Sequence, residues 1–89
     1  MQIDYTVQIW REGNQYVAHA LPLDVMSSGT TVEEARRALD EAVHLFLTTA
    51  TEVGTLDLVL EEAGYNLTDD RWQSPYWVSI ERHTAELRG

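Results

Sequence analysis

Apolar residues recur every three or four positions across residues 32–50, and this spacing requires one long amphipathic helix. Thr30 and Thr31 both precede the stripe, and each is followed three residues later by a glutamate. This pattern is typical of a capping box, and acids in the first turn complement the helix dipole. Gly54 is a natural end for the helix. The stripe consists of Val32, Ala35, Leu39, Ala42, Val43, Phe46, Leu47 and Ala50.

The residues before this helix alternate between apolar and polar side chains, which is the period of a β-strand. Residues 2–10 and 15–21 predict two strands, joined by a hairpin turn at Gly13-Asn14. Pro22 ends or bends the second strand because proline cannot donate a ladder hydrogen bond. Residues 25–28 predict a short third strand. The alternation places Trp10 on the face of the sheet that points away from the helices.

The second half of the chain predicts a shorter helix and one more strand. Thr55 caps a helix over residues 56–63, which Gly64 ends. Residues 65–74 are rich in turn formers and predict a loop, whereas residues 76–86 predict the last strand. The order is β-β-β-α-α-β. We therefore expect a single α+β domain over residues 1–89, with one antiparallel sheet covered on one face by helices.

The composition excludes several classes of protein. The chain has 89 residues, with 15 Asp and Glu, six Arg, no Lys and no Cys, so its formal charge is −9. An acidic chain with scattered arginines argues against direct binding of nucleic acid. Disulfides and thiolate chemistry are absent. There is no membrane-spanning apolar stretch and no signal peptide, so a cytoplasmic location is expected. Because so short a chain has a thin core, we expect a dimer, a tetramer or another partner.

Few residues indicate chemistry. The three histidines lack the spacing of metal ligands, and the glycines are isolated at the ends of elements. We therefore expect no enzyme, cofactor or metal. Asp4 is the one exception, because aspartate is disfavoured within strands. A strand carboxylate near others would hold Mg²⁺ in a nuclease, although a solvated aspartate is the simpler interpretation.

The aromatic residues point more clearly to a function. Three tryptophans in a chain of this size is a high count. A large aromatic side chain on the open face of a sheet is often the anchor of a protein interface. The alternative is that Trp10 packs beneath the returning C-terminal segment. The residues expected to contact a partner are Trp10, Glu12, Asp24, Trp72 and Trp77.

Five short motifs follow one another between residues 5 and 50. They are Glu12-Gly13, Tyr16-Val17-Ala18, Leu23-Asp24-Val25, Ser27-Ser28-Gly29-Thr30-Thr31 and Glu33-Glu34-Ala35. In this order and spacing they resemble the HicB family of antitoxins. Residues 54–65 resemble the tail of the single-domain members of that family. The resemblance extends over about two thirds of the chain.

The resemblance implies a partial RNase H-like fold, β-β-β-α-β with an extra helix, and no hydrolase activity. It also implies a role, which is to bind and block a small basic HicA-type toxin that cleaves mRNA. Many HicB proteins add a C-terminal DNA-binding domain. The 25 residues after Gly64 are not basic and contain no recognition helix, so we expect no operator binding. The alternative is an orphan HicB-like domain that associates with itself and has no toxin partner.

Overall fold

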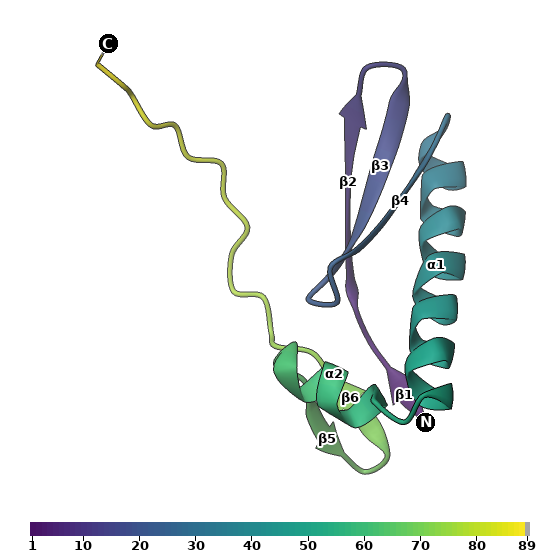
Figure 1. Ribbon diagram of the computed structural model, residues 1–89. Coiled ribbons are helices and arrows are strands. Elements are labelled where there is room, and N and C mark those ends of the chain that lie inside the picture. Colours follow the sequence, from purple (N-terminus) through teal and green to yellow (C-terminus); the bar gives the residue numbers. More distant parts are fainter. Residues whose placement is uncertain (89) are drawn as a thin grey trace.

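The computed structural model describes residues 1–88, which form six strands in two sheets and two helices (Figure 1). The predicted α+β class is confirmed, since a helix packs on a sheet. Neither helix of the described residues combines the length and the apolar composition needed to cross a membrane. The elements are β1 (Gln2–Ile3), β2 (Thr6–Glu12), β3 (Gln15–Leu21), β4 (Val25–Gly29), α1 (Val32–Glu52), α2 (Leu56–Glu62), β5 (Asn66–Thr68) and β6 (Arg71–Gln73).

The larger sheet is the antiparallel meander predicted for the first third of the chain. Its strand order is β2-β3-β4, with Trp10 opposite Val17 and Ala18 opposite Ser27. The turn between β2 and β3 consists of two residues, and Gly13 adopts a φ of 59° there. Glycine takes this left-handed conformation without steric cost, and a tight hairpin matches the twist of the strands.

Helix α1 begins at Thr31, one of the two predicted caps. The Thr31 hydroxyl accepts a hydrogen bond from the backbone N–H of Glu34 at 3.0 Å. The Glu34 carboxylate in turn accepts one from the backbone N–H of Thr30 at 2.9 Å. The hydrogen bond from the Thr30 hydroxyl has the largest effect on the pKa of Glu34, and the one from the Thr30 backbone has the next largest. Both lower this pKa. The helix ends at Glu52, two residues before Gly54, whose φ is 78°.

The core lies between α1 and one face of the larger sheet. Ala18 and Ala20 of β3 are fully buried, and so are Ala35 and Leu39 of α1. Gly29 at the end of β4 permits this close approach. A Cβ atom there would lie 2.6 Å from the backbone nitrogen of Ala35, well inside van der Waals contact.

The smaller sheet corrects two predictions. Residues 65–74, predicted as a loop, contain the antiparallel hairpin β5–β6. Asp69 and Asp70 form its turn with φ values of 50° and 64°, a conformation that aspartate tolerates and that one type of two-residue hairpin turn requires. Strand β6 then pairs in parallel with β1, with Ile3 opposite Trp72. The predicted first strand is therefore split between two sheets, and the prediction of a single antiparallel sheet is wrong.

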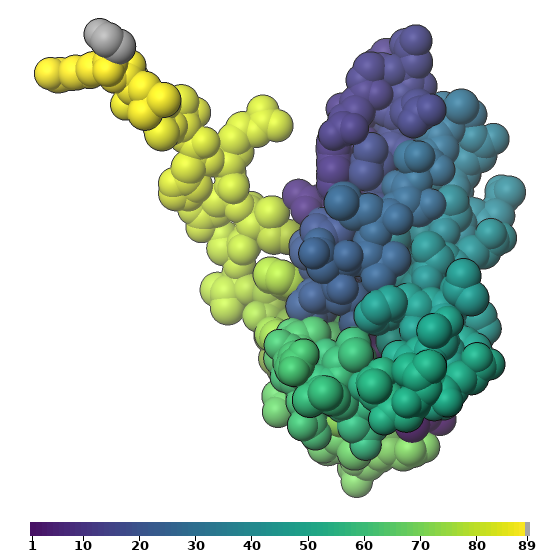
Figure 2. Space-filling view, in the orientation of Figure 1, coloured from purple at the N-terminus to yellow at the C-terminus, as the bar shows by residue number. Residues whose placement is uncertain are grey.

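The prediction of a last strand over residues 76–86 is also wrong for the single chain. Residues 74–88 follow β6 as an extended segment without secondary structure, which we call the C-terminal tail. The tail runs along the side of the larger sheet that is opposite α1 and then projects from the body (Figures 1 and 2). A strand needs the edge of another strand with which to pair, and the tail pairs with none among the described residues.

Candidate protein-binding face

The face of the larger sheet that points away from α1 is not covered by a helix. Because Ala18 and Ala20 point towards α1, their neighbours Val17 and His19 point to the opposite side. The register places Trp10 directly opposite Val17. Trp10 therefore lies on this open face, as the alternation in the sequence predicts.

Four side chains of the open face form a connected row, which we call the acidic row. The indole N–H of Trp10 donates a hydrogen bond to Glu12 Oε1 at 3.1 Å. The rings of Trp10 and His19 meet edge to face, with their centroids 6.1 Å apart and an interplanar angle of 89°. His19 Nε2 lies 2.6 Å from Asp24 Oδ1. The row thus runs from Glu12 through Trp10 and His19 to Asp24, with a carboxylate at each end.

The backbone positions Asp24 for its contact with His19. Asp24 lies in the turn after β3 with a φ of 62°, and its N–H donates a hydrogen bond to the carbonyl of Ala20 at 2.8 Å. Its side chain is 80% exposed, whereas that of His19 is only 17% exposed. His19 is therefore held between Trp10 and Asp24, while the Asp24 carboxylate remains accessible to a partner.

The open face combines negative charge with apolar surface. Glu12 and Asp24 are its acids, and no residue of β2, β3 or β4 that points to this side is an arginine. Beside the acidic row lies a shallow hollow of about 430 Å³ between Trp10, Val17 and Met26. Such a hollow suits a side chain that protrudes from a protein partner, because small-molecule sites are usually more enclosed.

The structure brings together three of the five residues predicted to contact a partner, Trp10, Glu12 and Asp24. Trp72 lies elsewhere: it is 3% exposed in the core, and its indole N–H has no hydrogen-bond partner there. Because Trp72 is buried in the core, the expectation that it contacts a partner is wrong. Trp77 lies on the C-terminal tail and is 46% exposed. His19 was not among the predicted contact residues, and its only signal in the sequence was its position in strand β3, two residues from Val17 on the same face.

Asp4, considered for a magnesium site, is engaged in structural contacts. Its Oδ1 accepts a hydrogen bond from the backbone N–H of Ser74 at 2.7 Å. Its carbonyl accepts one from the Tyr65 hydroxyl at 2.6 Å. Within residues 1–88, no three side chains of His, Asp or Glu gather as metal ligands would. Asp4 thus joins β1 to the end of β6.

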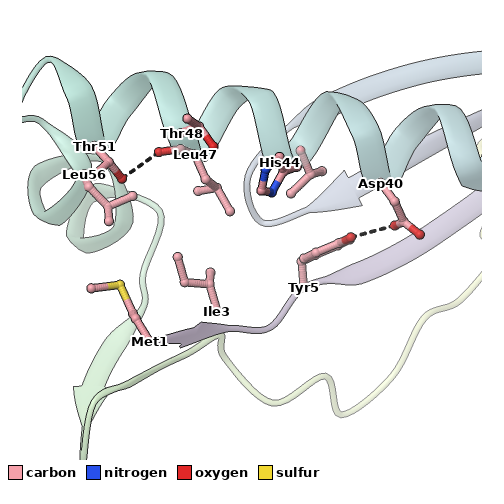
Figure 3. A pocket seen from close by; sticks show the side chains of 10 residues that line it. Met1, Ile3, Tyr5, Asp40, His44, Leu47, Thr48, Thr51 and Leu56 are labelled. Carbon is pink, nitrogen blue, oxygen red and sulfur yellow. Dashed lines mark hydrogen bonds between the residues drawn. The ribbon is translucent and has the colours of Figure 1, made fainter.

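A second hollow, of about 400 Å³, lies between β1 and the C-terminal half of α1 (Figure 3). We call it the α1 groove. Its apolar lining includes Ile3, Leu47 and Leu56. At one end the Tyr5 hydroxyl donates a hydrogen bond to Asp40 Oδ1 at 2.6 Å. Burial, followed by this hydrogen bond and the charge of Asp40, raises the pKa of Tyr5 to about 12.

The fold and the open face together define a small acidic α+β protein with one sheet face available for binding. No protein-family model, curated protein or solved structure matches the chain. The acidic row and its surroundings are therefore the features from which a function is inferred.

Proposed function

We propose that this protein is a HicB-like antitoxin domain that binds a small, basic, mRNA-cleaving toxin through its open sheet face. The observation that carries the proposal is the acidic row. It places an aromatic side chain between two carboxylates on an exposed face that has no arginine. A surface of this kind is complementary to a basic protein that binds RNA phosphates.

The mechanism would be steric occlusion. Glu12 and Asp24 would occupy positions on the toxin that RNA phosphates otherwise take, and Trp10 would supply the apolar anchor. The net charge of −9 would steer a basic toxin towards the face and raise the association rate. Neither step requires chemistry by the antitoxin itself.

Two features of the fold support this proposal. The chain order of a three-stranded meander followed by a helix agrees with what the family resemblance implies. A strand after the helices, β6, then returns to pair in parallel with β1. The resemblance implies such a final strand, although here it is only three residues long.

The first experiment is to purify the tagged full chain from its native cells at moderate salt and to identify any stoichiometric companion. The companion is then purified alone, and its cleavage of RNA is measured with and without the protein. We expect a small basic ribonuclease that the protein inhibits. A companion without RNA cleavage, or cleavage that the protein leaves unchanged, would refute the proposal.

Variants then test the binding face directly. Trp10→Ala should weaken binding of the companion by about 2 kcal/mol or more if Trp10 is an anchor. Leu58→Ala on the exposed side of α2 is the control, since it truncates an exposed apolar side chain far along the chain from the face. A loss below about 0.5 kcal/mol, as for an ordinary surface residue, at both Trp10→Ala and Trp77→Ala would contradict the assignment of the interface.

A further inference from the structure

Helix α1 leaves one edge of the larger sheet uncovered. Strand β2 is an end strand in the order β2-β3-β4, so one side of its backbone has no neighbouring strand in that sheet. Ala18 and Ala20 of β3, which face α1, are fully buried, but Val7 of β2 on the same face is 37% exposed. The α1 groove begins at Tyr5, two residues before Val7 in the chain, and extends along β1 (Figure 3). An apolar groove beside a free strand edge is a site for an added strand.

The C-terminal tail has the sequence of a strand but pairs with nothing. Tyr76, Val78 and Ile80 alternate with other residues, so an extended chain would place all three on one side. They are 92%, 98% and 65% exposed. Beyond Ser74, no described residue of the tail makes a backbone hydrogen bond to the body. The tail therefore exposes both its apolar side chains and its backbone groups.

The position of the tail favours a second copy of the chain as the partner. The tail runs on the side of the sheet opposite α1, whereas the groove lies on the α1 side (Figures 1 and 3). Within its own chain the tail pairs with no strand, and none of its residues lines the groove. The distribution of charge along the chain also favours an exchange of tails between copies. Residues 74–88 contain two arginines and two glutamates, so the net charge of −9 lies on the rest of the chain. The neutral tail is the segment by which two acidic bodies approach with least repulsion.

We propose that two copies of this protein form a dimer by exchanging their C-terminal tails. Residues 76–81 of one copy add as a strand to the free edge of β2 in the other copy. Tyr76, Val78 and Ile80 then cover Val7 and enter the α1 groove. The exchange gives the tail the strand partner that it lacks in the single chain, and it leaves the acidic row free for another protein.

The first test is the mass of the full-length protein in solution, measured by sedimentation equilibrium between 1 and 100 µM, a range typical of protein association. We expect a dimer of the 10.2 kDa chain. The double variant Val78→Pro/Ile80→Pro should raise the dimer dissociation constant at least about 100-fold, because proline removes ladder donors. Ala85→Pro, outside the strand-forming run, is the matched control. A monomeric native protein, or an unchanged dimer in the double variant, would overturn the proposal.

A second test locates the contact and distinguishes exchange from folding back. The chain has no cysteine, so a Val78→Cys chain and a differently tagged Val7→Cys chain can be mixed and oxidised. We expect a disulfide between the two tags, at least tenfold more abundant than with Leu58→Cys, an exposed site on α2. Equal yields would refute the assigned edge. A chain that carries both Val78→Cys and Val7→Cys and forms only an internal disulfide would refute exchange between copies.

The dimer and the toxin proposal can fail separately. Trp10→Ala lies on the opposite face from the groove, so it should leave the dimer dissociation constant within about twofold while it weakens toxin binding. The sedimentation measurement contains no toxin. Its outcome therefore bears on the tail alone.

Discussion

Asp4 Oδ1 accepts a hydrogen bond from the backbone N–H of Ser74 at 2.7 Å, although the two residues are 70 positions apart. The contact lies where the parallel pair β1–β6 ends and the C-terminal tail begins. The Asp4 N–H also donates to the Trp72 carbonyl at 3.3 Å. Asp4 thus sets the point at which the end of the chain leaves the body.

Removing this acceptor should loosen the junction without unfolding the protein. Asp4→Ala should lower the free energy of unfolding by about 0.5–1.5 kcal/mol, the net value of one hydrogen bond. Asp4→Asn retains an oxygen at the same position, so its free energy of unfolding should fall by less. Urea unfolding followed by far-UV circular dichroism measures both variants. An equal loss in the two variants would contradict a role for the Ser74 hydrogen bond.

The two C-terminal tryptophans should differ sharply in their contribution to stability. Trp72→Ala should cost about 3–5 kcal/mol, because it empties a buried site in the core. Trp77→Ala should change the free energy of unfolding of the single chain by less than about 0.5 kcal/mol, as is usual at the surface. Chemical denaturation at protein concentrations below the dimer dissociation constant makes the comparison. Similar losses at both positions would show that the tail packs on the body.

Gly29 should not tolerate a side chain. Gly29→Ala brings a Cβ atom to 2.6 Å from Ala35 N and 2.7 Å from Glu34 Cβ. The start of α1 must then move, at a cost of about 1–3 kcal/mol, as for other overpacked sites. Ser28→Ala, at the neighbouring exposed position of β4, is the control. Thermal unfolding of the two variants side by side would reveal the difference, and an unchanged midpoint for Gly29→Ala would contradict the contact.

The protein should lose stability at alkaline pH through Tyr65, which is buried, and Tyr5, which is partly buried. Burial, and then the charge of Asp4, raises the pKa of Tyr65 to about 12, and Tyr5 is raised to the same value. Since the folded state holds these protons more tightly than the unfolded state, their stabilisation is complete below pH 10. It is lost as the pH rises towards 12. The chain has no lysine, whose titration would overlap this pH range.

The measurement is the midpoint of urea unfolding between pH 8 and pH 11.5. It should fall with increasing pH above 10, and the fall should be shallower in Tyr65→Phe, which cannot ionise. Tyr76→Phe is the control because Tyr76 is exposed on the tail. A slope that is the same in the native protein and in Tyr65→Phe would contradict the assignment.

Local patterns in the sequence were sufficient for the elements that depend on near neighbours. The stripe over residues 32–50 predicted α1, and Thr31 with Glu34 predicted its cap. The alternation before it predicted the β2–β3 hairpin and the face on which Trp10 lies. These features follow from periodicity, turn chemistry and capping, all of which act within a few residues. The antitoxin role rests on a resemblance and stays a prediction.

Contacts between distant residues decided the rest. Strands β5 and β6 are three residues each, too short for an alternating pattern of apolar and polar residues to be recognised. They exist because β6 pairs with β1 about 70 positions earlier. That pairing buries Trp72 and divides the first predicted strand at Asp4. The C-terminal tail shows the opposite case, since it alternates as a strand does but pairs with no edge among the described residues of its own chain. The sequence by itself determined which segments are able to be helix or strand. Only the tertiary structure decided which strands find partners, because a β-strand is stabilised by backbone groups of another segment and not by its own.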